Sequence, residues 1–242
     1  DIQRRAHNRV VSVSCSSAHT CLVTSEGYVL TMGCGLNGRL GHGDVKECRL
    51  PRVVEKLKTS NAFIKKACCG GRHTMALSDT SRVYSWGYGR TGALGLGHLA
   101  THEAQRVDMK VPTTVSLLEE VRPYEIAAGG LHSAALCQNG QLLTWGWGLD
   151  GQLGRPCEGG ESVPAPALLP KGLNARHVSC GGHHTLMLLD DNNVYACGAN
   201  QDGQLGLGHA KLVKRPSCIE MLEGKDVYYL AAGRRFSIAV CE

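Results

Sequence analysis

The sequence lacks any apolar run that approaches the ~18 residues of a membrane-spanning helix, so it is not that of a helical membrane protein. Its 12 cysteines include no C-x-x-C pair, which argues against a zinc site built on such pairs. It also lacks a long basic tract, because its net charge of +5 comes from scattered residues and short pairs. No signal peptide is recognisable at its start. We therefore expect reduced thiols in an intracellular protein of the cytoplasm or nucleus.

A catalytic pattern is missing as well. The sequence contains no G-x-S-x-G nucleophile elbow, and its serines, histidines and aspartates show no local context that suggests a catalytic triad. We therefore expect neither an enzymatic site nor a cofactor.

Glycine, in contrast, is abundant, and the 31 glycines follow a repeated pattern. Residues 83–97 (VYSWGYGRTGALGLG) return in similar form at 29–43, 142–154 and 194–208. Their G-x-G-x-x-G spacing also occurs in dinucleotide-binding loops, but such loops lead directly into a helix. Here proline-marked coil follows each copy, which excludes a dinucleotide-binding loop.

A second motif precedes each copy and contains a histidine. It reads CGGRHTMAL at 69–77, and the column defined by its histidine holds His19, His73, His132 and His184, with Phe236 in the fifth place. Successive members of the column are 54, 59, 52 and 52 residues apart. A period near fifty predicts a repeat architecture in which each unit buries its faces on its neighbours.

Each repeat contains four short β-rich segments. Two of them form a hairpin that begins at the column histidine and turns at Gly, Asn, Asp or Ser. A third segment lies upstream of the histidine, at 64–68, 124–128, 176–180 and 227–231. A fourth, marked by proline, suits an edge strand and is found at 50–54, 163–169 and 215–219. Four-stranded antiparallel units with this period predict an all-β propeller.

The two motifs together, W-G-x-G-x-x-G-x-L-G at 86–95 and G-G-x-H-T at 70–74, resemble the repeat of the regulator of chromosome condensation family, the RCC1-like β-propeller. The resemblance covers residues 9–242, which we expect to form one domain. It implies a ring of seven blades and a non-enzymatic platform for protein partners, since this fold serves many functions.

Compared with seven blades, the sequence contains four full repeats plus flanking half-blades, which predicts a partial or incomplete ring. The first group lacks a proline-marked strand, and the last ends without a Trp-Gly strand. Residues 1–8 show no periodicity and are predicted to be a leader or an expression remnant. The remaining blades would be absent from this chain, deleted, or supplied by another chain.

Ten repeat positions are predicted to be structural. Histidines related by blade rotation lie too far apart to share one metal ion, whose ligands must be ~2 Å away, so we expect each to hydrogen-bond a neighbouring turn. The glycines suit positive φ angles or close backbone approach. The ten are His19, His73, His132, His184, Gly33, Gly87, Gly146, Gly198, Trp86 and Trp145.

The first set of candidate partner-binding residues lies beside the histidine column, where the motif places the preceding residues on one loop face. None of those residues is acidic, whereas acidic loop residues contribute to GTPase contact in family members that resemble the Ran exchange factor. Arginine and histidine suit an acidic protein surface or phosphate groups instead. This set is Arg72, Leu131, His183, Arg234 and Arg235.

A second set lies where the repeat is longest. The separation of 59 residues places extra length within 98–122, where 111–120 breaks the repeat, and loops that depart from a rigid repeat often carry specific contacts. A short helix over 115–121, capped by Thr114, is predicted there. This set is Lys110, Glu119 and Glu120.

These observations predict a protein-protein interaction scaffold, for which a larger assembly could cover the open blade edges. Two other classes of function stay open. One is a guanine nucleotide exchange factor for a Ran-like small GTPase. The other is a chromatin or nucleic-acid-binding module, which the +5 charge suggests.

Overall fold

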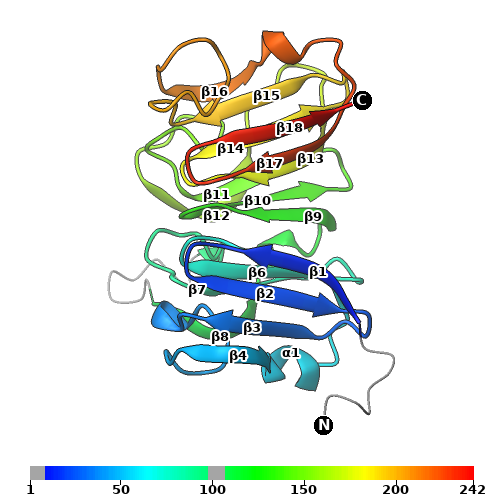
Figure 1. Cartoon of the computed structure of the whole chain (residues 1–242), viewed down its shortest axis with the longest axis vertical. Helices are drawn as coiled ribbons and strands as arrows, with labels where there is room; N and C mark the ends of the chain where they lie inside the picture. Colours follow the sequence, from blue (N-terminus) through cyan, green and yellow to red (C-terminus); the bar gives the residue numbers. More distant parts are fainter. Residues whose placement is uncertain (1–8, 98–106) are drawn as a thin grey trace.

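The computed structural model describes residues 9–97 and 107–242, and five antiparallel sheets account for most of this part of the chain (Figure 1). Four sheets have four strands each, paired in chain order, and the fifth has two. The first two sheets comprise β1 (Val10–Cys15), β2 (His19–Thr24), β3 (Val29–Gly33) and β4 (Cys48–Val53), then β5 (Ile64–Cys69), β6 (His73–Ser78), β7 (Val83–Gly87) and β8 (Met109–Thr114). The other three comprise β9 (Pro123–Ala128), β10 (His132–Cys137), β11 (Leu142–Trp147) and β12 (Gly160–Pro166), then β13 (Ala175–Cys180), β14 (His184–Leu189), β15 (Val194–Gly198) and β16 (Val213–Cys218), and finally β17 (Val227–Ala232) and β18 (Ser237–Cys241).

The two sequence motifs meet at one register position in each full sheet. Each column histidine begins the second strand and lies opposite the first glycine of the glycine-rich motif, as His73 does opposite Gly87. Gly87 has φ +110°, and a Cβ built on it would lie 2.6 Å from the carbonyl oxygen of Arg72. Only glycine fits this close approach, which explains why the same residue type occupies this position in all four sheets.

The hydrophobic core is divided among the spaces between successive sheets. One cluster of buried side chains joins the first sheet to the second, another the second to the third, and two more continue to the fifth. Trp86 and Trp145, both 0% exposed, fill two of these interfaces. Each sheet therefore buries both of its faces only where it has a neighbour on both sides, as in a propeller.

The order of the sheets confirms a partial RCC1-like propeller with four full repeats. In Figure 1 the first sheet lies in the lower part of the molecule and the fourth and fifth lie in the upper part. Strands β1 and β17 belong to separate sheets, so the described residues contain no strand pairing that joins the first sheet to the last. Residues 1–8, the predicted leader, lie outside the described part.

The prediction that the first group lacks a proline-marked strand was wrong. Strand β4 contains Pro51 and pairs with β3, which completes the first sheet. Each proline-marked strand is the fourth strand of the sheet whose hairpin precedes it in the sequence. It is not the first strand of the next sheet. The two-stranded β17–β18 sheet is therefore the half-blade that the structure shows.

The prediction that 111–120 breaks the repeat was also wrong. Strand β8 is a regular fourth strand, and Pro112 within it corresponds to Pro51 in β4. The 3₁₀ helix η4 (Ser116–Leu118) then follows, with Val115 and not Thr114 at its N-cap and no side-chain cap.

Comparable short helices follow the fourth strand elsewhere. They are α1 (Glu55–Thr59), with Val54 at its N-cap, and η5 (Glu220–Leu222), with Ile219 there. An apolar residue is needed at this position because its side chain is buried while its backbone N–H bonds the third strand of the same sheet. The extra length of this repeat lies between Gly97 and Met109, mostly outside the described residues. A 3₁₀ helix of the first sheet, η2 (Leu36–Gly38), precedes β4, and none of the helices found in residues 9–97 and 107–242 could cross a bilayer.

Candidate interaction face

The column histidines connect each sheet to the next. His73 Nε2 lies 2.8 Å from Ser133 Oγ on the third sheet, and that hydroxyl donates to the carbonyl oxygen of Ala93 at 2.8 Å. The same arrangement occurs from His19 to Thr74, from His132 to Thr185 and from His184 to Ser237, at 2.8 to 3.0 Å. The Nε2 partner is thus a hydroxyl on the next sheet, and the prediction of a neighbouring turn was wrong for this nitrogen. His19 does bond a residue of the neighbouring turn, Ser16, through Nδ1.

These contacts determine the proton positions on the rings. Because each hydroxyl donates its own hydrogen to a carbonyl, the imidazole must donate from Nε2. Nδ1 of His73, His132 and His184 is buried without a hydrogen-bond partner among the described residues, so a second proton there would be unsatisfied. Burial lowers the pKa of His73 to about 4 and, together with the neighbouring histidines, that of His132 to about 3. The column histidines are neutral hydrogen-bond donors, and the part of the chain that the structure describes contains no cluster of three metal-ligating side chains.

The tryptophans complete the same junctions. Trp145 Nε1 donates to the Ala93 carbonyl at 2.9 Å, so this oxygen accepts from both Ser133 and Trp145. Trp86 and Thr74 share the Arg39 carbonyl in the same way. The repeated Trp-Gly and Gly-Gly-x-His motifs thus supply the contacts that hold the sheets together.

The candidate partner-binding residues divide between two ends of the sheets. We call the end formed by the loops 16–18, 70–72, 129–131, 181–183 and 233–235 the glycine-loop face. It holds the first predicted set, because those residues lie in the loops between the first and second strands of their sheets. Glu119 and Glu120 follow η4 at the opposite end, which we call the turn face. Lys110 lies near the start of β8, beside Met109, which pairs with Gly87 at the glycine-loop end, and its Cα packs against Gly38 of η2. The structure therefore separates Glu119 and Glu120, but not Lys110, from the end of the sheets that holds the first predicted set.

Two members of the first set are paired with acidic residues of the preceding sheet. His183 Nδ1 lies 2.9 Å from Asp150, and Arg235 Nε lies 3.7 Å from Asp202. Asp150 and Asp202 occupy the same loop position in their repeats, directly before a motif glycine. Two of the basic side chains expected on this face thus already have an acidic partner within the molecule.

The other three members offer more to a partner. Arg72 is exposed, and its guanidinium lies over the Tyr88 ring at 5.4 Å from the ring centre. Leu131 is half-buried. Arg234 is exposed, and within residues 9–97 and 107–242 its guanidinium makes no hydrogen bond or ion pair. The glycine-loop face therefore presents one stacked arginine, one unpaired arginine and an apolar side chain on three different sheets.

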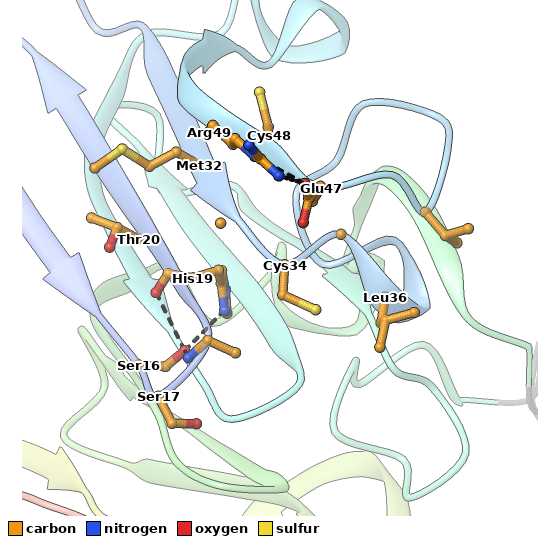
Figure 2. Close-up of a pocket in the computed structure, with 14 residues that line it drawn as sticks. Ser16, Ser17, His19, Thr20, Met32, Cys34, Leu36, Glu47, Cys48 and Arg49 are labelled. Atoms are coloured by element: carbon orange, nitrogen blue, oxygen red, sulfur yellow. Dashed lines mark hydrogen bonds and ion pairs between the residues drawn. The ribbon is translucent and has the colours of Figure 1, made fainter.

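A pocket of about 870 Å³, which the sequence did not predict, lies at the same end of the first sheet (Figure 2). His19 Nδ1 bonds Ser16 Oγ at 2.9 Å inside it, and an Arg49–Glu47 ion pair lines its rim. Thr20 and Met32 occupy the positions that Thr74 and Trp86 have in the second sheet. There, a loop of the first sheet covers Thr74 and Trp86 through the Arg39 carbonyl, whereas Thr20 and Met32 line the pocket. This pocket depends on the place of its sheet in the order, so no local motif could have indicated it.

Known proteins resemble this chain over nearly its whole length. The family model described as the RCC1-like domain matches residues 2–242. The human E3 ubiquitin-protein ligase HERC2 is 30% identical over 100% of this chain, and the ultraviolet-B receptor UVR8 of Arabidopsis thaliana is 32% identical over 96% of it. The chain spans only 5% of the first of these proteins and 51% of the second.

Solved structures agree with the fold. Human WBSCR16 superimposes with a TM-score of 0.84 and Prp20p of Saccharomyces cerevisiae with 0.82, each at 21% identity. These alignments cover 96% and 97% of this chain but 58% and 56% of the other chains. The paired motifs, the stacked four-stranded sheets and the match over residues 2–242 show that this chain belongs to the RCC1-like domain family.

Proposed function

We propose that this chain is a non-catalytic protein-interaction module that binds its partner through the glycine-loop face. The observation that carries the proposal is that two sets of polar side chains in the repeats have different surroundings. The buried histidines, hydroxyls and indoles hydrogen-bond between sheets, whereas the variable residues beside them are exposed on loops. A rigid repeat with variable loops is suited to recognition.

The partner we propose is a protein that carries acidic groups. Arg72 and Arg234 offer guanidinium groups that form strong paired hydrogen bonds with carboxylate or phosphate oxygens. Arg235 and His183 contribute less, because each already has an aspartate partner, Asp202 and Asp150 respectively. The proposed contact with acidic groups thus depends on fewer basic residues than the sequence alone suggests. All 12 cysteines are free thiols, which supports the intracellular location that we propose.

A charge-reversal experiment tests this assignment. The double variant Arg72→Glu/Arg234→Glu should lose partners that quantitative affinity purification recovers with the unmodified chain. The matched control is Arg82→Glu/Lys171→Glu, which reverses two exposed charges on the turn face. If both double variants lose the same partners, or if neither does, the glycine-loop face is not the binding surface.

Two further assays distinguish the other classes of function. Prp20p of Saccharomyces cerevisiae binds Gsp1p and histones, but at 21% identity the likeness of this chain to it carries the fold and not the activity. If catalytic amounts of this chain accelerate the release of a fluorescent guanine nucleotide from a Ran-like GTPase, the chain is an exchange factor and the scaffold assignment is wrong. Binding to duplex DNA that weakens steeply as salt rises would favour a nucleic-acid-binding module.

A further inference from the structure

The first strands of successive sheets place one side chain each at the same register position near the hub of the propeller. Strands β5, β9, β13 and β17 lie beside one another in this order. Each residue at this position pairs with the fourth residue after the histidine column, as His177 pairs with Leu188. The side chains are Lys66, Glu125, His177 and Tyr229, which we call the hub network.

Short polar contacts connect the hub network. Glu125 Oε1 accepts from Lys66 Nζ at 3.1 Å and from His177 Nδ1 at 2.8 Å. On its other side His177 Nε2 lies 3.3 Å from the carbonyl oxygen of Leu230, and its ring centre lies 5.8 Å from that of Tyr229. His177 therefore bridges the third sheet, through Glu125, and the fifth, through Leu230.

The geometry at His177 requires two protons on the ring. A carboxylate and a backbone carbonyl can only accept hydrogen bonds, and a neutral imidazole has a single N–H. Both contacts are therefore made only by the imidazolium form. The column histidines differ, because Nε2 of His132 faces a hydroxyl while its Nδ1 has no partner.

The surrounding charges favour the imidazolium form. The hydrogen bond and charge of Glu125 outweigh burial and leave the pKa of His177 above its ordinary value. Burial acts to raise the pKa of Glu125, but His177 and Lys66 outweigh it and leave that pKa below its ordinary value. The other neighbours are Tyr229 on β17 and, on β14, the uncharged Leu188. Glu125 thus remains a carboxylate when His177 loses its proton.

We propose that the hub network is a proton-dependent contact, in which the imidazolium form of His177 joins the third, fourth and fifth sheets and loss of its proton loosens the β17–β18 sheet. In the folded chain the proton is bound more tightly than in the unfolded one. The stabilising contribution is therefore complete at pH values below about 6.5 and is lost as pH rises through the folded pKa.

Nuclear magnetic resonance of the unmodified chain tests the proposal directly. The imidazole C2–H of His177, assigned by its loss in His177→Asn or through backbone correlations, should titrate with a midpoint above about 6.5. The amide signals of Leu230 and Ala231 should shift with the same midpoint. A His177 midpoint below that value would overturn the proposal, and this measurement requires no variant to fold.

A stability measurement tests the linkage. The thermal midpoint of the unmodified chain should fall between pH 6 and pH 8.5 by more than that of Glu125→Gln, which removes the carboxylate that holds the proton. The matched control is Glu158→Gln, because Glu158 is an exposed carboxylate on the third sheet's loop. Equal pH dependence in Glu125→Gln and the unmodified chain would contradict the proposal.

Discussion

Replacement of Thr185 by valine tests the role of the hydroxyls between sheets. Thr185 is 0% exposed, and its Oγ1 accepts from His132 Nε2 at 2.9 Å and donates to the carbonyl oxygen of Gln152 at 2.7 Å. Valine keeps the shape and the β-branch but removes both hydrogen bonds. The substitution therefore isolates the polar contribution of this junction.

The expected loss follows from what is left unpaired. The His132 N–H would have no acceptor, and the Gln152 carbonyl would keep only a long contact of 3.9 Å from Cys197 Sγ. A buried group left unsatisfied costs ~1–3 kcal/mol, so we expect Thr185→Val to lower the free energy of unfolding by about 2–4 kcal/mol. For a chain of this size that corresponds to a fall of very roughly 4–15 °C in thermal midpoint.

The chain provides its own control at the same column position. In the part of the chain that the structure describes, the Thr20 hydroxyl hydrogen-bonds only to Cys15 Sγ, at 3.5 Å, and the side chain is half-buried. Thr20→Val should change the free energy of unfolding by less than ~0.5 kcal/mol. Urea unfolding followed by tryptophan fluorescence measures both variants. Similar losses for Thr185→Val and Thr20→Val would refute the idea that the hydroxyl junctions hold the sheets together.

Three further predictions concern the same framework. Because burial depresses the pKa values of the column histidines, their stabilising contribution is present above about pH 6.5 and is lost as pH falls toward 4. The urea midpoint of unfolding should therefore drop over this pH range. His132→Phe, which copies Phe236, should reduce the number of protons taken up on unfolding there by about one. Gly87→Ala should lower the free energy of unfolding by ~2–4 kcal/mol. The control Gly172→Ala should lower it by ~1 kcal/mol, because Gly172 also has a positive φ but a Cβ added there meets no atom within 4 Å. Equal losses would contradict the close-approach argument. Trp145→Phe should cost ~1–2 kcal/mol by calorimetry, because Ala93 keeps its bond from Ser133, and a loss above 4 would contradict that sharing.

The inter-sheet contacts have a consequence for recognition. His183 and Arg235 look free in the sequence, yet each is held by an aspartate of the preceding sheet. Such pairs place a carboxylate beside two of the basic side chains of the glycine-loop face. Under the proposed function, an acidic partner would contact Arg72 and Arg234, which have no carboxylate partner among residues 9–97 and 107–242.

The sequence also contains a recurring hydroxyl position that belongs to the contacts between sheets. A serine or threonine follows every column position, at Thr20, Thr74, Ser133, Thr185 and Ser237, and four of these five hydroxyls are the partners of histidines on the preceding sheet. The recurrence was visible along the chain. Its meaning was not, because the two residues that bond each other are 53 to 60 positions apart.

The architecture could be predicted from the sequence, because the repeated glycines and histidines satisfy local backbone and register requirements that are the same in every sheet. Which sheet each proline-marked strand completes depends on long-range pairing, and so does the separation of Glu119 and Glu120 from the glycine-loop face. The tertiary structure also created the hub network. Lys66, Glu125, His177 and Tyr229 share a register position but not a residue type, so no pattern connects them until the sheets stack around the hub and bring their charges within hydrogen-bond distance.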